Sequence, residues 1–114
     1  MSNRNDLRSK ALSSGKVRKE IKEIDGLKYE IRQPSVGVRN EIFDKSRDDK
    51  GEINPMLFLV WAIIYLAYVP ESDERVFEEG DFPTLMNTPA GGIVDELGSA
   101  CSKVLGVEED ERKK

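Results

Sequence analysis

The sequence predicts an α+β fold, mainly α, with an N-terminal β-hairpin followed by three to four helices packed around a central apolar helix. Three observations support this. An Asp-Gly pair at 25–26 separates two segments with the composition of strands. Residues 55–68 (PMLFLVWAIIYLAY) carry no charge, although 35% of the chain is charged. Residues 93–105 repeat apolar side chains at helical spacing.

The hairpin is expected over residues 17–32, after a basic arm that is either disordered or a short helix around 6–12. A two-residue loop would pair Ile21 with Glu30 and scatter the apolar residues over both faces. We favour a three-residue loop, 24–26, with Gly26 as a left-handed bulge, because it pairs Ile21 with Tyr29. It gathers one apolar face, Val17, Ile21, Leu27, Tyr29 and Ile31, and leaves the other in water, Arg18, Glu20, Lys22, Lys28, Glu30 and Arg32.

The first helix of the main domain is predicted over 36–46. Ser35 follows Pro34 and can cap it. Its buried stripe is expected to contain Val38, Ile42 and Phe43. A loop over 47–53 then leads to the central helix.

The central helix is predicted over 55–68, between an Asn54 cap with Pro55 at its first position and a stop at Val69-Pro70. An acidic connection follows, in which Val76 and Phe77 are expected to turn inward. Asp81 can cap a single turn that ends at Met86.

The last helix is expected to start at Asn87-Thr88-Pro89 and to end at Leu105, with Gly106 as a left-handed stop. Its buried stripe follows one pattern of helical spacing: Ile93, Leu97, Ala100, Cys101, Val104 and Leu105.

Composition limits the organisation of the chain. At 114 residues we expect a flexible basic arm (1–16), one α+β domain (17–106) and a disordered charged tail (107–114). Residues 1–22 hold seven basic and two acidic residues, whereas 71–111 hold two basic and twelve acidic residues. These opposite charges could steer head-to-tail self-association or be solvated faces, and the basic arm could meet nucleic acid. The arm lacks interleaved aromatic residues, so no nucleic-acid partner is expected.

Several function classes are disfavoured. The chain has no histidine, which excludes Ser-His-Asp and Cys-His catalysis and His-based metal sites. One cysteine and no apolar leader segment indicate a reducing, intracellular setting. Residues 46–57 lack calcium ligands at three EF-hand positions, residues 89–92 lack the P-loop Lys, and the acidic group at 78–81 is hydrophilic. Cys101 falls on a buried stripe. We therefore expect no enzyme, catalytic residue, cofactor or metal site.

The central helix is apolar on every side, so protein or lipid must enclose it. Its fourteen residues reach about 21 Å, short of the roughly 30 Å hydrocarbon core, so no membrane span is expected. A domain of this size buries only about two-thirds of its unfolded surface. We therefore expect the helix to be a core helix that also offers one side, and a groove beside the last helix, to a partner. The predicted interface residues are Met56, Leu57, Val60, Trp61, Ile64, Tyr65, Tyr68, Ile93 and Leu97.

The order of these elements resembles the tail assembly chaperones of long-tailed bacteriophages. The resemblance spans roughly 17–106 and is strongest in IRQPSVGVRNEI (31–42) and VFEEGDFPTLMNTPAGGIVDELGSACSKVLG (76–106). It implies a non-catalytic protein of the host cytoplasm that forms homo-oligomers, binds and solubilises the tape measure protein, recruits the major tail protein, and is absent from the mature virion. Two alternatives remain: a virion structural or head–tail joining protein, and a small DNA-binding regulator.

Overall fold

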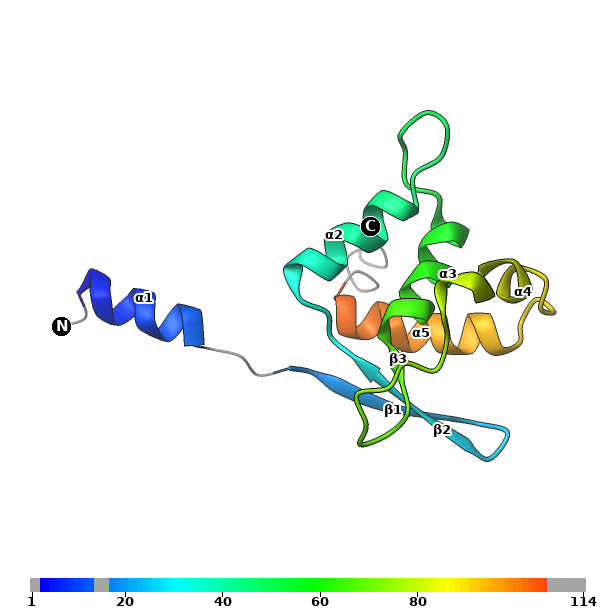
Figure 1. Cartoon of the computed structure of the whole chain (residues 1–114), viewed down its shortest axis with the longest axis horizontal. Coiled ribbons are helices and arrows are strands. Elements are labelled where there is room, and N and C mark those ends of the chain that lie inside the picture. The colour runs from blue at the N-terminus through cyan, green and yellow to red at the C-terminus, as the bar shows by residue number, and fades with distance from the viewer. Residues whose placement is uncertain (1–2, 14–16, 107–114) are drawn as a thin grey trace.

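The computed structural model describes residues 3–13 and 17–106. Its α+β, mainly α architecture confirms the predicted fold class (Figure 1). The tail predicted over 107–114 and the end of the arm, 14–16, lie outside the described residues. The elements are α1 Arg4–Ser13, β1 Lys19–Ile24, β2 Leu27–Arg32, α2 Val36–Lys45, α3 Pro55–Leu66, β3 Ala67–Tyr68, the 3-10 turn η1 Glu79–Asp81, α4 Phe82–Met86 and α5 Ile93–Leu105.

The hairpin β1–β2 closes with a two-residue turn, so the predicted three-residue loop is wrong. Asp25 and Gly26 both have positive φ, 53° and 80°, as the tight hairpin turn that matches strand twist requires. Ile24 therefore pairs with Leu27, and Ile21 pairs with Glu30 rather than with Tyr29. Ile21 lies on the face away from the helices, where 55% of it is exposed.

The observed register buries Glu30 on the hairpin face that points away from the helices, where the side chain has hydrogen-bond partners. Only 4% of Glu30 is exposed. Its carboxylate accepts hydrogen bonds from Arg32 Nε at 2.7 Å and from the backbone N–H of Glu71 at 3.0 Å. The prediction that Glu30 and Arg32 face water is therefore wrong. These hydrogen bonds replace those that water would make to the carboxylate, so the outer face of the hairpin can be covered at Glu30.

Helices α2 and α3 begin where the sequence predicted. Ser35 Oγ accepts a hydrogen bond from Val38 N, and Asn54 Oδ1 accepts two, from Met56 N and Leu57 N. α3 ends at Leu66, however, and not at Tyr68. Residues 67–68 form β3, which pairs antiparallel with β2 and completes a sheet of order β1-β2-β3.

The C-terminal half departs from the prediction at one boundary. α5 begins at Ile93, not at Asn87, because residues 89–92 form a turn in which Gly91 has φ 82°. Its end is as predicted, with Gly106 left-handed at φ 75°. Asp81 precedes α4, but its side chain accepts from Glu78 N instead of capping α4.

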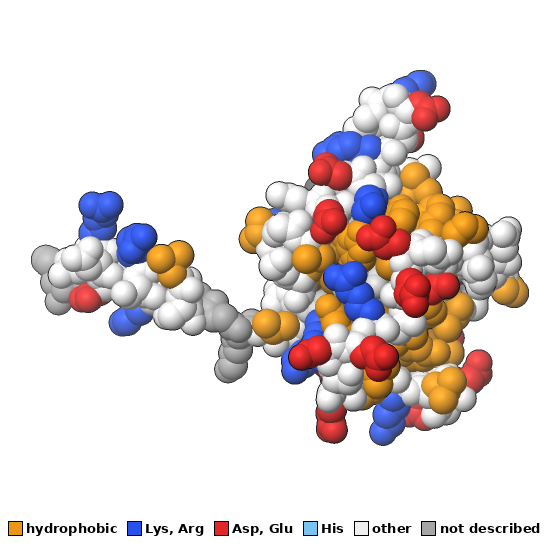
Figure 2. Space-filling model, viewed as in Figure 1, with side chains coloured by type: hydrophobic (Ala, Val, Ile, Leu, Met, Phe, Trp, Pro, Cys, Tyr) orange, Lys and Arg blue, Asp and Glu red, His pale blue; other side chains and the backbone are white. Residues whose placement is uncertain are grey.

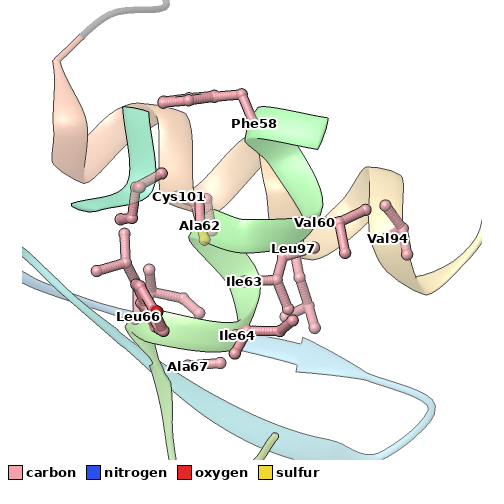
Figure 3. Close-up of a cluster of buried hydrophobic side chains, with 14 of the residues drawn as sticks. Phe58, Val60, Ala62, Ile63, Ile64, Leu66, Ala67, Val94, Leu97 and Cys101 are labelled. Atoms are coloured by element: carbon pink, nitrogen blue, oxygen red, sulfur yellow. The ribbon is translucent and has the colours of Figure 1, made fainter. Parts of the chain in front are cut away.

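The core lies where α3 meets α5, α2 and the sheet. Among the helix pairs, α3 and α5 share the most extensive contact. Ala62 and Ile63 of α3 point toward the side on which Leu97 and Cys101 of α5 lie (Figure 3). Val76 and Phe77 pack against this core as predicted. α1, in contrast, is exposed along its whole length and stands away from the core (Figure 1).

Candidate protein-binding surface

The predicted interface residues divide into a buried and an accessible group. Val60, Ile64, Tyr65 and Leu97 are at most 3% exposed, so they form core rather than surface in this chain. The accessible residues are Met56, of which 46% is exposed, and four partly exposed side chains, Leu57, Trp61, Tyr68 and Ile93. α3 is thus enclosed over most of its length and opens outward at its first turn and at Trp61.

Trp61 lies at the centre of an aromatic and charged group. Its ring stacks on Phe82 of α4, with centroids 4.7 Å apart and planes at 16°. Lys45 Nζ of α2 lies 4.9 Å from the centre of the Trp61 ring. The same ammonium group is 3.8 Å from Glu79 Oε1. We call Leu57, Trp61 and Phe82, flanked by Lys45 and Glu79, the Trp61 surface.

The Trp61 surface combines residue types that anchor protein interfaces. A partly exposed tryptophan held by stacking presents a large apolar area at little further entropic cost on binding. Lysine and glutamate at its edge can pair with charges on a partner. On the face drawn in Figure 2, hydrophobic side chains gather over α3 and toward α4, with acidic side chains among them.

Tyr65 has a structural role. Its hydroxyl donates a hydrogen bond to Glu79 Oε2 at 2.8 Å, and Arg75 lies 4.8 Å from its ring centre. Burial, followed by the neighbouring Glu79 carboxylate, raises the pKa of Tyr65 to about 12, so the phenol stays protonated and donates. The bond ties α3 to the acidic connection before α4.

Tyr68 belongs to a second structural network. The Arg32 guanidinium lies 4.1 Å from the Tyr68 ring centre and pairs with Asp73 Oδ1 at 3.1 Å. It also donates to the carbonyl of Ser72. The hydrogen bonds from Glu71 N and from Arg32 hold the pKa of Glu30 below its ordinary value of 4.5. This network fixes segment 69–75 over the outer face of β2.

The groove predicted between the central and last helices is filled where Gly98 meets Leu59. Gly98 of α5 faces Leu59 of α3 so closely that a Cβ at position 98 would come within 2.9 Å of Leu59 Cδ2. Side chains therefore fill the space along the middle of the two helices. A partner would have to bind beside this contact, not within it.

A pocket does open at the N-terminal end of α5. It has a volume of about 160 Å³ and lies between the start of α3, α4 and the start of α5. Segment 88–90 closes one side. The remaining lining comes from Met56 and Val60 of α3, Leu85 and Met86 of α4, and Val94 and Asp95 of α5. We call it the α4–α5 pocket.

Phe82, Met86 and Lys45 were not predicted as surface residues. Phe82 and Met86 could have been found from the short, apolar α4 sequence FPTLM, whose five residues can bury little. Lys45 gave no such signal, because its place beside Trp61 depends on how α2 crosses α3.

The described residues hold no group of three or more acidic or cysteine side chains arranged to bind a metal ion. Cys101 is fully buried, and burial raises the pKa of its thiol to about 12, which disfavours the nucleophilic thiolate. Within 3–13 and 17–106, no helix combines the length and the apolar character needed to cross a bilayer. Comparisons with protein-family models, curated proteins and solved structures found no match.

Proposed function

We propose that this protein is a phage tail assembly chaperone, a non-catalytic factor of the host cytoplasm. It binds and solubilises the tape measure protein and recruits the major tail protein while the tail is built, and it is absent from the finished particle. Two arguments support the proposal: the sequence resemblance over 17–106, and a surface suited to a helical apolar client.

The observation that carries the proposal is the exposed side of Trp61. The chain encloses most of α3, yet it leaves a tryptophan, Leu57 and Phe82 partly open at one place. Partial exposure of a stacked aromatic pair with lysine and glutamate beside it fits transient binding of an amphipathic helix. A tape measure protein, a long helical chain with apolar stripes, presents many such segments.

Charge gives the chaperone a second property. The net charge of the chain is −4, and twelve acidic residues lie in 71–111. An acidic exterior stays hydrated and helps to keep a complex with an apolar client soluble. Binding through a few open apolar side chains and solubilising through charge need no catalytic group.

Co-expression with a candidate tape measure protein tests this function. The wild-type chain should move the tape measure protein into the soluble fraction and co-purify with it. Trp61→Asp should abolish both effects, whereas Val36→Asp, at a residue that is 67% exposed on α2, should retain them. Circular dichroism and thermal melting of both variants show whether each is folded. A folded Trp61→Asp chain that still solubilises the client contradicts the proposal.

Mass spectrometry of purified particles separates the proposal from a virion structural or head–tail joining role. A chaperone should be missing from the particles, whereas a joining protein should be present at constant copy number. The regulator alternative rests on the exposed basic α1. A mobility shift with duplex DNA that weakens steeply with salt would favour it.

A further inference from the structure

α1 is a helix whose apolar side chains are uncovered. Every residue of α1 is exposed, including Leu7 at 60% and Leu12 at 72%. A ten-residue helix is marginal in water without a surface to pack on. Such a helix gains stability when its leucines find an apolar site.

One face of α1 combines apolar and basic side chains. At 100° per residue, Leu7, Arg4, Arg8 and Leu12 fall in that order within an arc of about 140°. Two guanidinium groups therefore lie between two leucines. Asp6 projects from the opposite side. A matching site must be apolar and must also carry negative charge.

The α4–α5 pocket meets both requirements. Its lining includes the apolar residues Met56, Met86 and Val94 and the acidic residue Asp95. Two other pockets fit a basic helix poorly, because one is lined by Arg32 and Arg75 and the other by Arg39. Local charge thus selects the α4–α5 pocket.

We propose that α1 of one copy docks into the α4–α5 pocket of a second copy, so that chains associate head to tail. The charge of the whole chain favours this pairing, since 1–22 is strongly basic and 71–111 strongly acidic. α1 also stands away from its own core, in a position to reach another molecule (Figure 1). The contact is heterologous, so repeated docking builds a ring or an open chain of subunits. This inference is independent of the client and survives if the proposed function fails.

Light scattering of the full chain over a range of concentrations tests association. The mass should rise with concentration at about 0.1 M salt and fall toward that of one chain at about 1 M salt, because the pairing is electrostatically assisted. A chain that stays monomeric throughout overturns the proposal. This includes the outcome in which α1 folds back onto its own pocket.

Charge reversal locates the contact. Arg8→Glu alone and Asp95→Arg alone should each raise the dissociation constant by about tenfold or more. Mixed in equal amounts, the two variants should associate again in alternating order. The acidic arm of the first meets the basic pocket of the second, and the unchanged arm of the second meets the unchanged pocket of the first. Self-association that survives Arg8→Glu unchanged contradicts the proposal.

A second pair of variants controls for the possibility that Asp95→Arg disturbs the fold. Asp95 Oδ2 accepts a hydrogen bond from Gly91 N at the turn before α5, so Asp95→Arg could loosen that turn. Met86→Lys, at a side chain of the pocket that is 41% exposed, places a positive charge against the arginines of α1 and should weaken association similarly. Val36→Lys, outside the pocket, should leave association unchanged. A monomeric wild-type chain that shifts duplex DNA through Arg8 instead would assign α1 to nucleic acid and overturn the proposal.

Discussion

The ring of Trp61 lies nearly parallel to that of Phe82, with 4.7 Å between the centroids. The stack joins the middle of α3 to α4, a helix of five residues whose other anchor is the buried side chain of Leu85. Because both rings are partly exposed, the same contact stabilises the fold and shapes the surface on which the proposed function depends.

Removing the stack should destabilise the fold and change the environment of Trp61. Phe82→Ala should lower the free energy of unfolding by about 1 to 3 kcal/mol, since a partly buried aromatic and its ring contact are lost. It should also shift the emission of Trp61, the only tryptophan in the chain, to longer wavelength. Thr84→Ala, at an exposed position on the same helix, should do neither. Unchanged emission in Phe82→Ala contradicts the observed contact.

The Glu30–Arg32 pair should make stability depend on pH. The folded chain holds the pKa of Glu30 below 4.5, so ionised Glu30 stabilises the fold above that pH. This contribution falls as pH drops below 4.5 through the folded pKa. Glu30→Gln should cost about 1.5 to 3 kcal/mol near neutral pH, with the difference shrinking in acid.

Urea unfolding of wild type and Glu30→Gln across the acid range measures this effect. Glu23→Gln, an exposed carboxylate on β1, is the matched control and should track the wild type. Equal acid sensitivity of wild type and Glu30→Gln would show that the Glu30 carboxylate is not the group responsible.

Local signals predicted the starts of α2 and α3 and the end of α5, but not the end of α3 or the start of α5. Asn54 and Pro55 fix the first turn of α3 through contacts within three residues, which sequence rules describe well. Its end at Leu66 depends on the pairing of Ala67 with Ile31, a partner distant in sequence. The predicted hairpin register was wrong for the same reason. Burial of Glu30 depends on a hydrogen bond from Glu71 N, which is also distant in sequence.

Two lysine substitutions test the register. In the observed pairing Ile21 is exposed on the outer face, so Ile21→Lys should change stability by less than about 0.5 kcal/mol. Ile31 is fully buried, so Ile31→Lys should cost more than about 4 kcal/mol or prevent folding. Thermal melts of the two variants give the comparison. A large loss in Ile21→Lys would favour the three-residue loop instead.

The close approach of α5 to α3 depends on the missing side chain of Gly98. Gly98→Val should destabilise by about 1 to 3 kcal/mol, because its Cβ alone would meet Leu59 Cδ2 at 2.9 Å. Leu59→Ala should relieve part of this cost when the two changes are combined. A double-mutant cycle from denaturant unfolding measures the coupling, and strictly additive losses would contradict direct contact.

The sequence located the helix that carries the candidate surface but not the side that stays open. The composition of α3 does not indicate which side of the helix is exposed, because the helix is apolar all round. Which residues remain accessible follows from how α2, α4 and α5 cover it. Val60 and Ile64 were therefore predicted as interface residues together with Trp61, and the structure buries them.

Trp61 fluorescence offers the most direct test of the claim that this surface holds another polypeptide. A tryptophan-free helical segment of a tape measure protein is titrated into the wild-type chain while emission and acrylamide quenching are followed. Binding at the Trp61 surface should shift emission to shorter wavelength and reduce quenching in a saturable way, as water leaves the indole. A segment that co-purifies with the chain yet leaves emission and quenching unchanged would show that the client binds elsewhere, and would contradict the account.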